Sequence, residues 1–339
     1  FGDMEFRSVF PSISSKLGVF ERLMGVKGIK EYQTGSSFTF YNMKTSADMH
    51  GYIEELGRNN IRFENIIKWF FEEYLVEEFN VKGFSFAISS KDSSYLEMCR
   101  NIASEMDGVL KQYRLYAEND SIDRELLEMS SRPVEFESLP SLRNKKYAYM
   151  NSNEIKQEMF YLFSDQCLLS YVERIGEKYE CLYDLLIKEE LHLSDYTRQG
   201  ELYQINWLIQ RNTLYVEDGI LKINLHRAFI LKDLYEHEVI CPDYYPSYLK
   251  ELLTEMNLVG DIYFTNTFLS IPESDYLNYV LNKSQYSNGM DLRNRYIHST
   301  YSENEELHKR NYVELMKIMV LIIIKINEEF SVKSEIKNA

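Results

Sequence analysis

The most apolar stretch of the chain, NYVELMKIMVLIIIKINEEF (residues 311–330), decides the fold. Apolar residues lie almost all round a helix of this sequence, which predicts a helix in the middle of a bundle. Its longest apolar run, IMVLIII (residues 318–324), is followed by Lys325 and is shorter than the roughly 18 residues that cross a bilayer. We therefore expect no contact with a membrane, and a soluble, cytoplasmic protein.

The composition favours long helices over many short strands. Of the 339 residues, 45% are hydrophobic and 14% aromatic, which suits a folded chain of two or three domains. Gly and Pro, with 14 and 6 residues, are scarce, so few turns interrupt the helices. The expected fold is mainly α, with helical bundles and a small β-hairpin in the middle of the chain.

The spacing of the cysteines and the absence of known cofactor motifs point to no metal and no cofactor. No pair of cysteines has CxxC spacing, and each lies in an apolar or amphipathic run, where it is expected to be a small buried hydrophobe (Cys99, Cys167, Cys181 and Cys241). The chain has no P-loop, GxGxxG, GxSxG or DxDxxG motif. ATPase, dehydrogenase and serine-hydrolase functions therefore lack support.

The net charge of −15 argues against a protein coated in nucleic acid, but the charge is unevenly distributed. Residues 271–339 contain nine Lys and Arg against ten Asp and Glu, a balance of −1. The other 270 residues therefore carry −14. The C-terminal segment is the least repulsive place for a phosphodiester.

Turn signals and helical periodicity divide the chain into three regions. Residues 1–130 are a helical N-terminal region, and residues 147–240 a helical domain with a hairpin. Residues 245–335 are a third, helical domain. Between the first two, SSRPVEFESLPSLRNKK (residues 130–146) has the composition of a linker.

Within the N-terminal region, two segments have the spacing of amphipathic helices, residues 61–80 and residues 93–118. SSFTFYNMKT (residues 36–45) alternates weakly and predicts a strand. The remainder of the first 50 residues shows no clear pattern.

The middle region contains a hairpin signal, TLYVEDGILKIN (residues 213–224). Asp218-Gly219 supplies the residues that a type I′ turn requires. Around that turn, two apolar pairs fall on one face: Leu214 with Ile223, and Val216 with Leu221. The order helix, turn, helix and hairpin resembles a winged helix. Few local residues are basic, which favours packing against a partner over DNA binding (Arg198, Arg211 and Lys222).

Just before the apolar helix lies DLRNRYIHST (residues 291–300), an unusually polar segment. Upstream of it, Ser270 and Glu273 have the spacing of a capping box and predict the start of another helix. The Asn-Gly pair at residues 288–289 then ends that helix or forms a turn. Two arginines, an asparagine and a histidine thus stand between two predicted helices.

Arg293-Asn294-Arg295-Tyr296-Ile297-His298 resembles the Arg-polar-x-x-x-His signature of the HEPN superfamily. The resemblance covers residues 245–335, less than a third of the chain, and rests on this motif with its helical setting. It implies a C-terminal antiparallel helical bundle. It also implies a metal-independent endoribonuclease, often a toxin or an effector of antiviral (phage) defence, whose site forms between two copies of the chain.

The residue types suit RNA cleavage. RNA carries its own nucleophile, the 2′-hydroxyl, so a ribonuclease needs a group that moves a proton and a cation that stabilises the phosphorane. His298 suits the first role and Arg293 the second. Five residues on a helix separate them by about 140°, which predicts that a homodimer is needed to bring Arg and His together.

The neighbouring polar residues have supporting roles in this interpretation. Asn294 is expected to orient the catalytic pair, and Arg295 to bind a neighbouring phosphate of the substrate. Tyr301 is a further candidate for substrate binding. In HEPN toxins controlled by adenylylation, a tyrosine follows the histidine by two positions; here that position is Thr300 and Tyr301 comes one later. This departure weakens the case for control by adenylylation.

The sequence leaves other interpretations open. One is a non-catalytic HEPN module that binds nucleotide or a protein partner through the same polar segment. Another is a winged-helix-like regulator. In a purely structural interpretation, Arg293 and His298 cap and solvate a helix end. With the ribonuclease interpretation, RNA is the expected substrate, and the N-terminal two-thirds are expected to sense a trigger or bind a regulatory protein.

Overall fold

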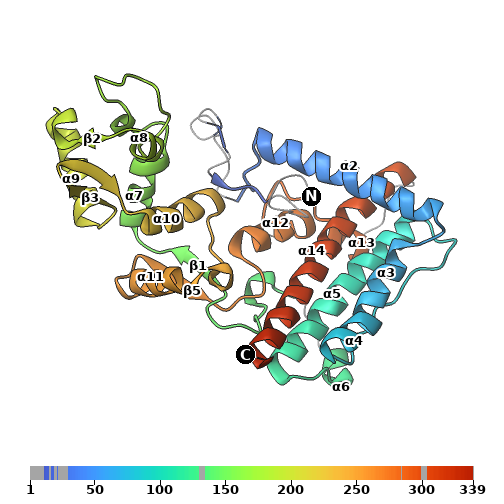
Figure 1. Ribbon diagram of the computed structural model, residues 1–339. Helices are drawn as coiled ribbons and strands as arrows, with labels where there is room; N and C mark the ends of the chain where they lie inside the picture. Colours follow the sequence, from blue (N-terminus) through green and yellow to red (C-terminus); the bar gives the residue numbers. More distant parts are fainter. Residues whose placement is uncertain are drawn as a thin grey trace. The chain divides into compact units, whose positions relative to one another are not determined.

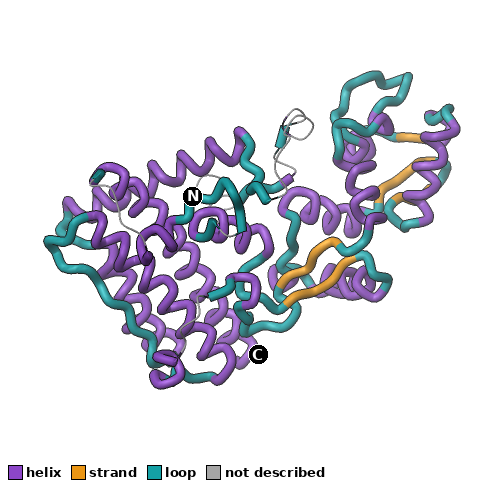
Figure 2. The backbone as a smooth tube through the Cα atoms, turned by 180° about the vertical axis from the view of Figure 1, so that it is seen from behind, coloured by secondary structure: helices purple, strands orange, loops and turns teal. Residues whose placement is uncertain are grey.

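The computed structural model describes residues 11–14, 17–18, 21, 30–129, 134–283, 285–298 and 304–338, without the side chains of residues 298 and 335–338. The chain divides into two compact units. Unit 1 consists of Phe1–Asn144 and Asn266–Ala339, and unit 2 is Lys145–Thr265. The described residues are mainly helical, as the composition predicted, with small antiparallel sheets (Figure 2).

The described part of unit 1 is helical (Figure 1). Its helices are α2 (Ser36–Arg58), α3 (Phe63–Trp69), α4 (Leu75–Phe79), α5 (Tyr95–Asn119), α6 (Arg124–Met129), α12 (Ile271–Leu281), α13 (Leu292–His298) and α14 (Glu305–Asn338). A π-helical turn, Phe70–Tyr74, joins α3 to α4, and a 3₁₀ turn covers Phe136–Ser138.

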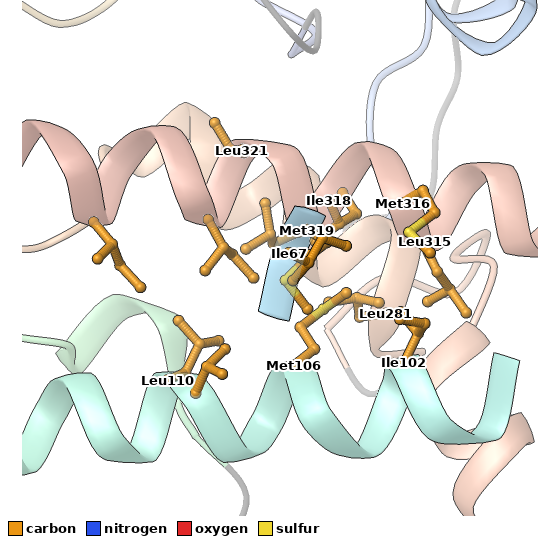
Figure 3. Packing of buried hydrophobic residues seen from close by; sticks show 14 of the residues in the cluster. Ile67, Ile102, Met106, Leu110, Leu281, Leu315, Met316, Ile318, Met319 and Leu321 are labelled. Atoms are coloured by element: carbon orange, nitrogen blue, oxygen red, sulfur yellow. The ribbon is translucent and has the colours of Figure 1, made fainter. Parts of the chain in front are cut away.

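Helix α14 is the central helix of unit 1, which confirms the prediction for residues 311–330. Figure 3 shows Ile102, Met106 and Leu110 of α5, spaced four residues apart, pointing toward it. On α14, the fully buried residues include Leu315, Met316, Ile318, Met319 and Ile322. Each such side chain contributes about 1.5–3 kcal/mol of burial free energy. No helix in the described part of the chain is long and apolar enough to cross a membrane.

Two predicted helices are confirmed and one predicted strand is wrong. Residues 61–80 form α3, the π-helical turn and α4, and residues 93–118 form α5, which begins with a capping box of Ser94 and Glu97. Residues 36–45, however, are the start of α2. The alternation of Phe38 and Phe40 suggested a strand, but only Phe38 is buried (5% exposed); Phe40 is 58% exposed. The helix buries one of these rings and leaves the other in solvent.

The segment predicted as a linker is largely packed. Residues 130–133 lie outside the described residues, but Phe136 and Leu139 belong to the core of unit 1. Arg143 is also buried and pairs with Glu328 at 2.9 Å and with Glu329 at 3.4 Å. The described part of this segment, residues 134–146, is therefore not a free linker.

Unit 2 combines helices with two small sheets. Its helices are α7 (Asn153–Phe163), α8 (Leu182–Lys188), α9 (Gln199–Gln210), α10 (Leu225–His237) and α11 (Ser247–Leu258). Its strands are β1 (Tyr147–Met150), β2 (Leu191–His192), β3 (Leu214–Glu217), β4 (Ile220–Ile223) and β5 (Ile262–Thr265). Short 3₁₀ turns cover Leu168–Ser170, Leu193–Asp195 and Pro242–Tyr244.

The hairpin is confirmed in its exact register. β3 and β4 pair antiparallel, with Leu214 opposite Ile223 and Val216 opposite Leu221. The turn residues Asp218 and Gly219 have positive φ angles of 52° and 81°, as a type I′ turn requires. Val216 alone of the four apolar residues is exposed, at 42%. The three-stranded sheet has the order β2-β4-β3 and is antiparallel.

A buried ionic cluster ties unit 2 together. The carboxylate of Glu158 on α7 is fully buried and accepts from Arg227 Nε at 2.7 Å and Nη2 at 2.9 Å. Arg211 Nη2 donates to Glu158 at 3.1 Å and to Asp261 at 2.7 Å. Asp261 also accepts from Arg227 Nη2 at 2.9 Å. Thr213 donates to Glu158 as well. Two carboxylates and two guanidiniums therefore compensate one another, and all are buried except Arg211, whose side chain is 22% exposed.

The compact units differ from the three regions expected from the sequence. Residues 245–265 belong to unit 2, where Leu249 and Leu253 of α11 lie in the core and β5 pairs with β1. Residues 266–335 fold with the N-terminal helices instead, because α5 covers the apolar face of α14. The segment with HEPN resemblance is thus shared between the units, and its motif lies in unit 1.

Candidate functional site

Helix α13 carries the Arg-polar-x-x-x-His motif, and two apolar anchors fix its orientation. Leu292 and Tyr296, one helical turn apart, are 1% and 2% exposed. Arg295 is exposed and Ile297 is 38% exposed, while Arg293 and Asn294 are partly buried. The helix therefore presents its basic residues at the rim of the core and in solvent.

The start of α13 is held by Asp291. Its backbone has a φ of 59°, a left-handed conformation that Asp tolerates better than most residues. Its Oδ1 accepts from Asn294 Nδ2 at 2.8 Å and from the backbone N of Lys283 at 3.1 Å. Asn294 therefore stabilises the beginning of the helix through this bond. That it also orients the Arg–His pair stays a prediction.

Arg293 contacts a carboxylate from a distant part of the chain. Its Nη2 donates to Asp107 Oδ1 on α5 at 3.2 Å, and the two side chains are 15% and 16% exposed. The same carboxylate pairs with Lys111 at 3.0 Å and accepts from the backbone N of Val134 at 3.3 Å. Among the described residues, Nη2 is the only guanidinium atom of Arg293 with a hydrogen-bond partner.

Beneath the motif lies a buried polar network. Tyr296 Oη and His308 Nδ1 are 2.8 Å apart, and Asn311 Nδ2 donates to the same hydroxyl at 2.8 Å. Because the amide nitrogen can only donate, the hydroxyl oxygen accepts from Asn311, while the tautomer of His308 decides which group donates in the bond between Tyr296 and His308. His308 is 1% exposed and Asn311 6%. The first turns of α14 thus hold α13 by hydrogen bonds as well as by apolar packing.

Cys99 on α5 completes this network as a donor. Its Sγ lies 3.4 Å from the carbonyl oxygen of His308. Burial raises the pKa of this thiol to about 12, which makes it a poor nucleophile. Cys167 is also buried, whereas Cys181 and Cys241 are half-buried. The sequence-based interpretation of the cysteines as small buried hydrophobes is therefore confirmed for the first two.

The structure brings some of the predicted site residues together and leaves others open. Arg293, Asn294 and Arg295 lie on α13, with His298 as its last residue. The side chain of His298 and the whole of Tyr301 lie outside the described residues. The convergence of Arg293 with His298 across a homodimer therefore stays a prediction.

Sequence reasoning missed the partners of the motif, Asp107 and His308. Asp107 lies on α5, far away along the chain, and no local pattern connects it with Arg293. His308 did leave a signal, because it stands four residues before Tyr312 and on the same face of α14 as Leu315. A histidine on the apolar face of a helix predicts a buried polar partner.

The part of the chain that the structure describes contains no group of three or more His, Cys, Asp or Glu side chains that could hold a metal ion. Comparison of the chain with protein-family models, curated proteins and solved structures finds no match in any of the three. The geometry of α13 and its surroundings is therefore the ground for a functional proposal.

Proposed function

We propose that the chain is a metal-independent endoribonuclease of the HEPN type, acting in the cytoplasm in phage defence or as a toxin. The observation that carries the proposal is that most N–H donors of the Arg293 guanidinium have no hydrogen-bond partner among the described residues. A single atom of its guanidinium is engaged, at 3.2 Å, by a carboxylate that Lys111 shares. The remaining N–H groups are suited to a phosphate, which a guanidinium binds through two parallel hydrogen bonds.

The proposed reaction follows from the residue types on α13. His298 takes the proton of the 2′-hydroxyl or returns one to the leaving 5′-oxygen. The 2′-oxygen attacks phosphorus, the bond from phosphorus to the 5′-oxygen breaks, and a 2′,3′-cyclic phosphate remains. Arg293 stabilises the charge on the phosphorane. Arg295, exposed on the same helix, binds a neighbouring phosphate.

The proposal includes a homodimer with a composite site. The seven-residue helix α13 places residues 293 and 298 about 140° apart around its axis. Two copies related by a twofold axis bring the arginine and histidine of both chains into one cleft. Light scattering should therefore detect a dimer, whose interface includes residues 290–300.

The test compares matched variants on total RNA in the presence of EDTA. His298→Ala and Arg293→Ala should each lower the cleavage rate by roughly 100-fold or more, the loss expected for an acid–base group or an oxyanion donor. His226→Ala in unit 2 and Arg114→Ala on α5 are the matched controls and should cleave as the original chain does. Replacing the 2′-hydroxyl at the scissile position by hydrogen should abolish cleavage.

Two results contradict the proposal. One is full activity in His298→Ala, since no proton-transfer role then remains for that residue. The other is loss of activity with EDTA, which requires a metal. A helix-capping role for Arg293 and His298 predicts instead about 1 kcal/mol of lost stability with unchanged cleavage.

The ion pair between Arg293 and Asp107 favours a second candidate function, a non-catalytic module. An arginine held by an aspartate on α5 can serve to position α13 for binding a nucleotide or a protein partner. In that case the RNA ends do not change over time, while binding depends on Arg293 and Arg295. The cleavage assay separates the two candidates.

For unit 2 we propose a protein partner over DNA, despite its winged-helix order of elements. It contains twenty Asp and Glu against twelve Lys and Arg, so its field repels a phosphate backbone. Its exposed large hydrophobic residues include Tyr203 on α9 (69%) and Leu225 and Phe229 on α10 (58% and 52%). Such residues suit packing against a regulatory protein.

A further inference from the structure

A cavity of about 610 Å³ lies between α2 and the N-terminal half of α14. On α2 it is lined at helical spacing by residues such as Phe38, Asn42 and Ser46, and on α14 by Lys309, Arg310 and Glu314. Its volume lies within the roughly 300–1,000 Å³ of small-molecule pockets. None of these residues belongs to the motif on α13.

The floor of the cavity is a fixed polar network around a buried lysine. Lys317, 1% exposed, donates from Nζ to Asn42 Oδ1 and to Ser46 Oγ, both at 2.8 Å, and pairs with Glu314 at 2.9 Å. Ser46 Oγ in turn lies 2.6 Å from Glu314 Oε1. These bonds join α2 to α14 below the cavity, so its polar floor is already ordered without a ligand.

The mouth of the cavity carries charges of both signs, and one of its cations has no partner in the part of the chain that the structure describes. His50 and Lys309 lie at the edge, both near the carboxylate of Glu54, at 3.5 Å and 3.8 Å. Arg310 is exposed beside them, and no hydrogen bond or ion pair joins it to the described residues. A phosphate at the mouth would therefore find a guanidinium with all its donors available.

The inner wall is aromatic and also contains acceptors. Phe38 and Tyr279 line the cavity with their ring centroids 6.1 Å apart, in an edge-to-face arrangement. Glu306, which is exposed, and Glu314, which is already bonded to Ser46 and Lys317, add carboxylates to the lining. A ligand that satisfies all three features has a flat ring, N–H donors on that ring and an anionic group at some distance from it.

We propose that this cavity binds a 5′-mononucleotide, with the phosphate at the mouth against Lys309 and Arg310 and the base between α2 and α14. Lys309 and Arg310 of α14 contribute a cationic edge, and Phe38 of α2 and Tyr279 of α12 contribute an aromatic wall, which suit the phosphate and the ring of a nucleotide. This binding does not depend on the ribonuclease activity proposed above, and its test contains no RNA.

The position of the cavity suggests what its occupancy does. The turns of α14 that contribute Lys309 and Arg310 to the mouth also carry His308 and Asn311, which hold Tyr296 of α13. A ligand that bridges α2 and α14 would stabilise these turns and, through Tyr296, the helix that carries Arg293. The cavity is thus placed to act as a regulatory site.

The test is calorimetric titration of the full chain with adenosine 5′-monophosphate, adenosine and inorganic phosphate. We expect the monophosphate to bind more tightly than either part alone. The double variant Lys309→Gln, Arg310→Gln should weaken that binding by about tenfold or more. Ala47→Trp, which fills the cavity from an exposed position on α2, should abolish it. Lys82→Gln, an exposed lysine outside the cavity, is the matched control and should bind normally.

Three results overturn the proposal. The first is that the charge variant and Ala47→Trp both bind the monophosphate as tightly as the original chain does. The second is that inorganic phosphate binds as tightly as the monophosphate. The third is that none of the four common ribonucleoside monophosphates binds. Circular dichroism checks that the variants fold. If Ala47→Trp does not, the charge variant decides the question.

Discussion

Arg227 in unit 2 and Arg293 in unit 1 both pair with carboxylates, but they use their guanidinium groups differently. Arg227 makes three hydrogen bonds of 2.7–2.9 Å to the buried pair Glu158 and Asp261. Arg293 makes one, at 3.2 Å, to Asp107, and its side chain is 15% exposed. Arg227 thus gives three N–H donors to the fold and is buried, whereas Arg293 gives one and is partly exposed.

The difference separates a charge that the fold needs from one that is available to a ligand. Arg227 is buried and gives three of its five N–H donors to two buried carboxylates, so removing one of these partners leaves an uncompensated charge. A guanidinium at the rim of the core, held by one weak bond, loses little when that bond breaks. The predictions below test this contrast, beginning with the largest expected effect.

Glu158→Gln should lower the free energy of unfolding by about 3–5 kcal/mol, because it leaves Arg227 and Arg211 in the core with one carboxylate between them. Urea denaturation measures the change. Each unit contains one of the two tryptophans, Trp69 in unit 1 and Trp207 in unit 2, so a Trp69→Phe background reports unit 2 alone. Glu154→Gln, an exposed residue on the same helix, should change stability by less than about 0.5 kcal/mol.

Tyr296→Phe should cost about 1–3 kcal/mol, because it leaves His308 Nδ1 and the Asn311 amide buried without their common partner. Here the fluorescence of Trp69 follows unit 1 in a Trp207→Phe background. Tyr52→Phe removes a hydroxyl that is half-exposed on α2 and should have almost no effect. Equal losses in the two variants would mean that the hydroxyl of Tyr296 contributes nothing specific.

Asp107→Asn should cost only about 1 kcal/mol or less and should leave RNA cleavage intact, since Arg293 is proposed to act on the phosphorane. Asp48→Asn on α2, which has no ion pair among the described residues, is the matched control. A loss as large as that of Glu158→Gln would place Arg293 in the same class as Arg227 and remove the basis for the contrast.

The reactivity of Cys99 should report on the seam between α13 and α14, which is the contact that Tyr296 makes with His308 and Asn311. The effect expected here is on reactivity and not on stability. With its pKa raised to about 12 by burial, it should resist iodoacetamide at neutral pH, while the half-buried Cys241 reacts. In Tyr296→Phe, alkylation of Cys99 should become faster, because α13 is held less firmly. Mass spectrometry of tryptic peptides measures both rates, and an unchanged rate for Cys99 would show that the seam stays closed.

Features encoded by neighbouring residues were predictable from the sequence. The Asp-Gly turn fixed the register of β3 and β4, because only that pairing places Leu214, Leu221 and Ile223 together. Ser270 and Glu273 form the expected capping box at the start of α12. The apolar run around Leu315 could only be a buried helix. In each case, the decisive interactions lie within a few residues of one another.

Features that depend on distant partners were not predictable. β1 and β5 are four residues each and pair across most of unit 2, so neither shows a periodic pattern of its own. Periodicity shows which face of α14 is apolar, but it does not identify α5 as the helix that covers it. For the same reason, the motif on α13 was visible in the sequence while its partner Asp107 was not.

The discontinuity of unit 1 has a consequence for biosynthesis. Unit 2 is one continuous stretch, Lys145–Thr265, and all of it is translated before α14. Since domains generally fold as units during synthesis, unit 2 is expected to complete its core first. The apolar face of α5 is covered only when α14 has been made. The turn of α14 that holds Tyr296 comes later still, so a nascent chain or a prematurely terminated one lacks an anchored α13. For a protein proposed to cleave RNA, this order delays the assembly of its site until α14 has been translated.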